Sequence, residues 1–251
     1  MASAILETTG KKIHDLFGAL TFFFQFFGEL VSQFLRHGNR VTWHKSIIAH
    51  LHFATVIVIP LVLLSMLIGM ALTVGIHLTL ARFHLQQQAM VIIQTTMLRD
   101  IAPLPIGFVL CVHCGLNLIE KNHPSLHQSP KVVLLETIIP LFAGINIAAL
   151  LLYTYVFISF LFSAYITSYF ILETNTDEYL LRLSQIINPD EAIESLVKTV
   201  VYATTASLIA GYYYYAVASE VMPTRQAVSR IITRSLFWLI VISVGLKLSI
   251  P

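Results

Sequence analysis

The stretch Leu98–Gly115, LRDIAPLPIGFVLCVHCG, places a charged pair directly before an apolar run. Arg99 and Asp100 are followed by Pro103 and Pro105, and the chain then turns apolar. A charge at the centre of a bilayer costs roughly 2.5–3.5 kcal/mol on insertion scales, so charges at the mouth of a membrane span require a function or a partner. We interpret the pair as the polar entrance of a cavity in the membrane-embedded part of the protein.

The composition indicates an all-α integral membrane protein. Of the 251 residues, 57% are hydrophobic and only 11% are charged, whereas soluble domains carry about 25% charged residues. The formal net charge of +2 is too small to favour nucleic acid as a partner. Cys111 and Cys114 lie inside an apolar run and do not form a disulfide framework.

Residues 1–46 are expected to form a cytoplasmic N-terminus with one amphipathic helix, kept in the mature protein because no signal-peptide cleavage site is evident. From Ile13 to Leu35, apolar residues recur at helical spacing, and polar residues such as Asp15 and Glu29 interrupt them. This pattern predicts a helix that lies in the membrane interface. The alternative is a helix packed against a partner subunit.

Residues 47–251 are expected to form a single domain with five membrane spans. The first lies within the uncharged run Ser46–Ala81, which is longer than one crossing needs, and Pro60 is expected to bend it. Asn188 and Pro189 mark a helix start before the fourth span. The other spans are predicted at Ile101–Ile119, Thr137–Leu172, Leu196–Tyr215 (ending in an interfacial belt, Tyr212–Tyr215) and Ser235–Leu248.

The distribution of basic residues predicts the orientation. Residues 1–46 and the two expected loops Glu120–Glu136 and Ala218–Arg234 hold ten of the fifteen Lys and Arg residues, whereas Glu173–Glu194 is acidic. The positive-inside rule therefore places the N-terminus in the cytoplasm. Five spans then place the C-terminus on the outer, periplasmic side.

Three motifs in this order resemble the MlaE (YrbE) family, the permease subunits of MCE-type lipid ABC transporters. LSMLIGMALTVG (Leu64–Gly75) is similar to the family's first span. Leu98–Pro103 is similar to its Leu-Arg-Glu-Leu-Gly-Pro motif, and PTRQAVSRIITRS (Pro223–Ser235) to its final cytoplasmic loop. Lys198, at the head of the fourth span, also has a family counterpart.

The chain departs from the family pattern at several positions. His113 stands where the family has an arginine, and Lys247 where an acid is usual. The segment between the second and third spans is several residues shorter and keeps only Glu120, Pro124 and Pro130 of the pattern. In the family this segment includes the coupling helix that docks into the ATPase.

The resemblance implies a permease subunit, not an enzyme, of an ATP-driven phospholipid transporter in a bacterial inner membrane. Its implied partners are a separate ABC ATPase that binds ATP and Mg, an MCE-domain protein on the outer face, and a second permease copy, either identical or a related chain. No cofactor is then expected in this chain. The resemblance also places the first and fifth spans at the dimer centre, around the lipid cavity.

Four groups of candidate residues follow from the sequence and the resemblance. Each group has a simpler structural role as its alternative: capping or snorkelling for the charges, and packing for the apolar residues. The groups are lipid head-group contacts (Arg99, Asp100, Lys198, Lys247), lipid-tail contacts in the cavity (Leu64, Leu67, Met70, Val74), ATPase-coupling residues (Glu120, His123, Leu126, His127, Gln128) and inner-face residues that anchor to anionic lipid or contact the ATPase (Arg230, Arg234).

Two alternative functions belong to other classes. One is a membrane haem or metal protein for electron transfer. It is suggested by four histidines in or near the spans, with His52 and His113 as the conceivable ligand pair: His50, His52, His77 and His113. An intramembrane enzyme has less support, because no H-E-x-x-H or G-x-S-x-G motif is present.

Overall fold

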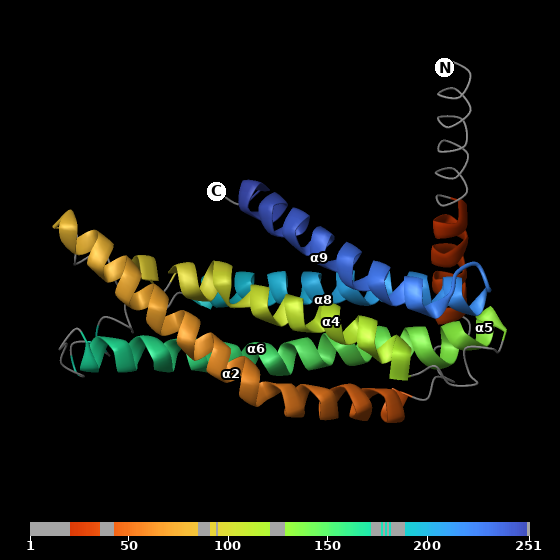
Figure 1. Ribbon diagram of the computed structural model, residues 1–251, viewed down its shortest axis with the longest axis horizontal. Helices are drawn as coiled ribbons and strands as arrows, with labels where there is room; N and C mark the ends of the chain where they lie inside the picture. Colours follow the sequence, from red (N-terminus) through yellow and green to blue (C-terminus); the bar gives the residue numbers. More distant parts are fainter. Residues whose placement is uncertain are drawn as a thin grey trace, which may run out of the picture.

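The fold is an elongated bundle of long helices in a computed structural model (Figure 1). The structure describes residues 21–35, 43–84, 91–93, 95–120, 129–171, 177, 179, 181 and 189–249. The main elements are α2 (Trp43–Arg82), α4 (Pro103–Glu120), α6 (Ile139–Phe170), α8 (Pro189–Ala218) and α9 (Thr224–Ser249). A short helix α5 (Pro130–Val133) precedes α6, and residues 21–35 are helical.

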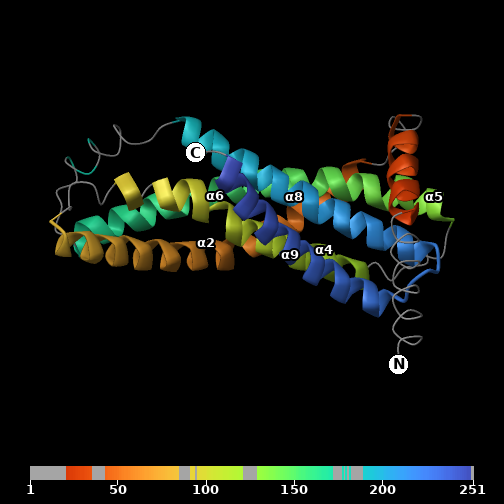
Figure 2. The ribbon, with the colours of Figure 1, turned by 90° about the horizontal axis from the view of Figure 1, so that it is seen from above.

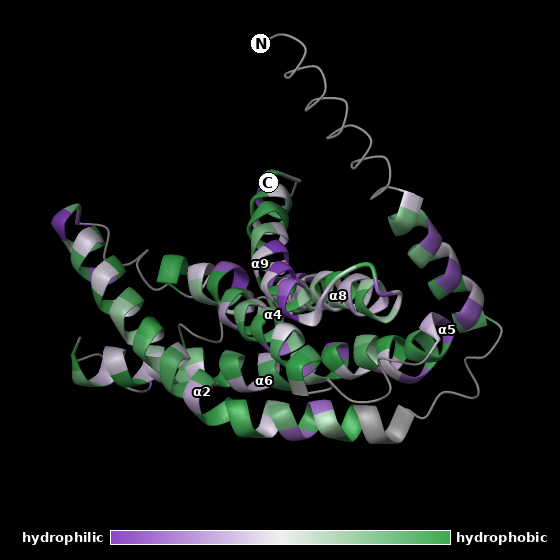
Figure 3. Cartoon of the chain, turned by 45° about the vertical axis from the view of Figure 1, so that its right-hand side comes forward, coloured by the Kyte–Doolittle hydropathy of each residue, from purple (hydrophilic) through white to green (hydrophobic). Residues whose placement is uncertain are grey.

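Five helical segments are long and apolar enough to cross a membrane, which confirms the predicted fold class. They are Ile47–Arg82, Val91–Ile119, Pro130–Phe170, Pro189–Ala218 and Thr224–Leu248. Figure 3 shows hydrophobic residues along most of α2 and α6. The chain is therefore a multi-pass membrane protein.

The fifth span is longer than predicted. The sequence suggests a basic loop up to Arg234 and a span from Ser235, but α9 begins at Thr224. Arg225, Arg230 and Arg234 are therefore on the helix and not in a loop. Because α9 has 26 residues and an α-helix rises about 1.5 Å per residue, the basic first turns extend the helix beyond a hydrocarbon core of about 30 Å.

The predicted features of the long helices are largely observed. α2 contains Pro60 and is bent in its middle (Figure 1), as expected where proline removes a backbone hydrogen bond. α8 begins at Pro189, with Asp190 and Glu191 in its first turn. The predicted tyrosine belt is mostly wrong, because Tyr213, Tyr214 and Tyr215 are buried in the protein.

Helical residues 21–35 lie across one end of the bundle. The segment is perpendicular to the long axis in two views, beside α5 (Figures 1 and 2). Phe26 is fully buried, while Phe24, Phe34 and Leu35 are exposed. Tyr215 of α8 donates a hydrogen bond to Glu29 at 2.9 Å, which holds the segment against the bundle. This orientation fits the interfacial helix predicted from the sequence.

Candidate functional site: a charged cluster at the mouth of the bundle

The four predicted head-group residues lie together in one chain of ion pairs. Arg99 and Asp100 belong to a π-helical turn, η2 (Thr96–Ile101), in which the amide of Ala102 bonds to the carbonyl of Met97 at 2.8 Å. Such turns insert an extra residue into a helix and are frequent at functional sites. η2 packs against α8, so both charges of the pair lie near the first turns of that helix.

Opposite charges alternate along the cluster. Nε of Arg99 lies 3.0 Å from Oε1 of Glu194, and Nζ of Lys198 lies 2.7 Å from the same oxygen. Lys198 also lies 3.6 Å from Oδ1 of Asp100, and Lys247 of α9 lies 3.0 Å from Oδ2 of Asp100. Three cations and two carboxylates leave the cluster with one net positive charge.

Burial differs strongly along the cluster. The Lys198 side chain is only 6% exposed, whereas Lys247 is 57% exposed and Arg99 is 26% exposed. The amine of Lys198 also lies 3.4 Å from the carbonyl oxygen of Arg99. The two end members are thus the cations that solvent or a ligand can reach, and the central lysine is held inside by two carboxylates.

The geometry can bind an anionic group at a low desolvation cost. A buried unpaired charge is strongly unfavourable, but alternating partners compensate most of the cost here. The excess positive charge and the reachable guanidinium of Arg99 suit a phosphate, which accepts charge-assisted hydrogen bonds. Sequence reasoning missed Glu194, although its position four residues before Lys198 on the α8 pattern is the spacing of a helical ion pair.

The predicted tail-contacting residues lie on α2. Leu64 and Leu67 are exposed, while Met70 and Val74 are partly buried. Their contact with lipid stays a prediction. The spans containing α2 and α9 are the least buried of the five, so apolar surface on both is available for acyl chains or another subunit.

The predicted coupling residues are mostly outside the described part of the chain. Four of the five lie outside the described residues: His123, Leu126, His127 and Gln128. Glu120 ends α4, but its side chain is not described.

The histidines form a different pair from the one predicted. Nδ1 of His50 lies 3.1 Å from Nε2 of His113, and the His113 ring stacks on Phe53. His113 therefore pairs with His50 and not with His52. A separation of 3.1 Å is the distance of a direct hydrogen bond between the two rings, in which one ring nitrogen donates and the other accepts.

The remaining described histidines and cysteines give no metal centre. Within the described residues, no group of three or more His, Cys, Asp or Glu side chains is arranged to hold a metal ion. Cys111 and Cys114 are free thiols, buried in the core. The tight packing of His50 against Gly144 shows that this histidine pair connects α2, α4 and α6.

The C-terminal part of the chain is similar to one known protein family. Residues 134–248 match the model of the family described as Permease MlaE. The match includes Glu194, Lys198, Lys247 and the motif Pro223–Ser235, while the motifs at Leu64–Gly75 and Leu98–Pro103 lie before it. No curated protein matches the chain.

Proposed function

We propose that this chain is an MlaE-type permease, the membrane subunit of an ATP-driven phospholipid transporter, because residues 134–248 match the model of that family. The observation that carries the proposal is the alternating cluster of Arg99, Glu194, Lys198, Asp100 and Lys247 at the mouth of the apolar bundle. A phosphate would bind at the end cations, and acyl chains would follow the exposed apolar faces of α2 and α9.

The proposed transport cycle requires other chains. No G-x-x-x-x-G-K-[ST] motif for nucleotide phosphates is present in the sequence. A separate ABC ATPase would therefore bind ATP and Mg and dock near residues 120–131. A second permease copy, identical or related, would complete the cavity, and an MCE-domain protein would exchange lipid on the outer face. ATP-driven closure of the ATPases would press the two permease halves together and change which side of the cavity is open.

The proposed setting is a bacterial inner membrane with the N-terminus in the cytoplasm. The basic first turns of α9 and the helical residues 21–35 would then lie at the inner face, and the charged cluster at the outer face. This arrangement would place the head-group site beside the MCE-domain protein. The orientation is supported by the charge bias of the sequence.

Two measurements test the proposal. Purification of the tagged chain from native membranes, followed by mass spectrometry, should recover an ABC ATPase and phospholipid. In the same membranes, a photoactivatable phospholipid should crosslink to the chain, and Arg99→Gln should lower the yield several-fold. Arg82→Gln is the matched control, because Arg82 is an exposed cation at the end of α2.

The outcomes separate the two parts of the proposal. Recovery of lipid without an ATPase would contradict ATP-driven transport. An equal crosslinking yield in Arg99→Gln, Arg82→Gln and the unchanged chain would show that the charged cluster does not bind the head group.

A further inference from the structure

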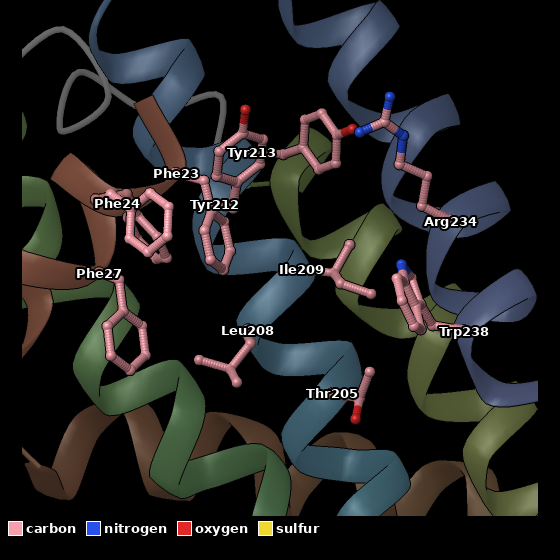
Figure 4. Close-up of a pocket in the computed structure, with 11 residues that line it drawn as sticks. Phe23, Phe24, Phe27, Thr205, Leu208, Ile209, Tyr212, Tyr213, Arg234 and Trp238 are labelled. Carbon is pink, nitrogen blue, oxygen red and sulfur yellow. The ribbon is translucent and has the colours of Figure 1, made fainter. Parts of the chain in front are cut away.

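A second candidate lipid site lies at the other end of the bundle. A cavity of about 830 Å³ is formed between helical residues 21–35, α8 and α9 (Figure 4). Its volume is in the range of small-molecule sites, about 300–1,000 Å³. Phe23, Phe24 and Phe27 form one wall, and Arg234 and Trp238 of α9 form the opposite wall.

This cavity is separate from the charged cluster. Glu194 of the cluster and Tyr213 of the cavity are both on α8, 19 residues apart in the sequence. At about 1.5 Å per residue, the two sites are therefore about 28 Å apart along the helix. A ligand of this cavity would not touch the head-group site proposed for transport.

The cavity combines apolar walls with a cation at one end. The guanidinium of Arg234 lies over the ring of Tyr213, 5.6 Å from its centroid. Among the residues that the structure describes, no carboxylate forms a salt bridge with Arg234. Arg230 is exposed one turn earlier on the same face of α9. An anionic group at this end would meet two cations.

The aromatic residues indicate a lipid as the occupant. Phe24 and Trp238 are 64% and 48% exposed, so the cavity opens to the apolar outer surface of the bundle and not to its interior. Aromatic rings and basic residues at a membrane interface contact acyl chains and head groups, respectively. A soluble anion would use the arginines and leave the phenylalanine wall uncovered.

We infer that this cavity binds one anionic phospholipid of the surrounding membrane, distinct from the transported lipid. The phosphate lies at Arg234, near Arg230, and an acyl chain packs between the phenylalanine wall and Trp238. The bound lipid would fill the space between helical residues 21–35 and α9, and so join the interfacial segment to the last span. The inference requires only that the chain spans a membrane and does not depend on transport.

Trp238 provides a direct reporter of the lipid. The sequence contains two tryptophans, so Trp43→Phe leaves Trp238 as the single indole fluorophore. The full chain is reconstituted into phosphatidylcholine vesicles that contain increasing fractions of dibrominated phosphatidylglycerol or dibrominated phosphatidylcholine. Bromine quenches indole fluorescence on contact. Half-maximal quenching should need about fivefold less of the anionic lipid, the selectivity expected from about one basic residue at a membrane surface.

The variants decide whether the preference arises in the cavity. Arg234→Gln should abolish most of the fivefold preference, while Arg225→Gln, on the same helix outside the cavity, should keep it. Both arginines are exposed, so neither change should impair folding. Equal quenching by the two lipids would overturn the inference, because it indicates ordinary lipid contact. Absence of quenching would also overturn it, because another protein segment would then cover the cavity.

Discussion

Lys198 is the residue on which the charged cluster depends. It pairs with both carboxylates and its side chain is nearly buried, so its removal leaves Glu194 and Asp100 undercompensated. Breaking a buried ion pair by removing one partner costs about 3–5 kcal/mol. Because Glu194 and Asp100 are partly exposed, we expect Lys198→Met to lower the free energy of unfolding by about 2–3 kcal/mol. Denaturant unfolding in mixed micelles measures this change in the free energy of unfolding.

Lys247→Met is the matched control for this prediction. Lys247 also pairs with Asp100 but is 57% exposed, and exposed pairs contribute about 0–1 kcal/mol. The loss should therefore stay below about 1 kcal/mol. Equal losses for the two variants would show that burial of Lys198 does not determine the stability of the cluster.

The sequence predicted which charged residues belong to the site better than it predicted which residues they pair with. Arg99 and Asp100 can be singled out from the sequence, because the free-energy cost of placing a charge in a membrane depends on the residue type. The partner Glu194 is 95 residues from Arg99, and its role requires the packing of η2 on α8. For the same reason, the sequence could not distinguish His50 from His52 as the partner of His113, since two residues on one helix differ only in the direction of their side chains.

At the scale of the elements, close packing of α2 on α6 is the main helix contact. A Cβ atom on Gly69 would clash with Oγ of Ser163 and lie 3.1 Å from Cδ1 of Phe160. Small residues allow such close approach between membrane helices. We expect Gly69→Ala to destabilise the protein by about 1–3 kcal/mol, the usual cost of overpacking, seen as a lower midpoint of thermal unfolding in detergent.

Gly75→Ala is the control on the same helix. Outside its own helix backbone and chain neighbours, no atom lies within 4 Å of a Cβ built on Gly75. This variant should therefore unfold at the same temperature as the unchanged chain, or slightly higher, since alanine favours helix. A larger loss in Gly75→Ala than in Gly69→Ala would contradict the observed α2–α6 contact.

Helix boundaries followed the sequence where a local signal exists. Pro189 with two acidic residues starts α8 because those residues fit the first turn of any helix. The start of α9 lacked such a decisive signal, because Arg225, Arg230 and Arg234 are polar enough to suggest a loop. They are accommodated in the helix because Ala227 and Ile231, on another face, are buried in the bundle.

At the scale of the whole molecule, the number of spans followed from composition, since the long uncharged runs have few alternatives in a bilayer. The cavity between helical residues 21–35, α8 and α9 could not be predicted from composition, because it is formed by three segments that are distant in sequence. The sequence alone suggests other roles for its residues: an interfacial helix for the phenylalanines, an aromatic belt for the tyrosines and a loop for Arg234.

The charge bias and the number of spans together predict that the two ends of α9 lie on opposite sides of the membrane. Arg225 and Leu248 are both exposed and lie 23 positions apart, which corresponds to about 34 Å of helix, enough to cross a core of about 30 Å. Cys111 and Cys114 are buried, so the unchanged chain should react little with a membrane-impermeant maleimide. Single added cysteines therefore report the side directly.

In intact cells whose outer membrane has been permeabilised, Leu248→Cys should be labelled by the maleimide and Arg225→Cys should not. Arg225→Cys should be labelled only after the inner membrane is opened. Labelling of both positions from one side would contradict a span at α9, whereas the reverse pattern would keep the span and invert the orientation. The inverted result would also move the charged cluster to the cytoplasmic face, where an MCE-domain protein on the outer face could not reach it.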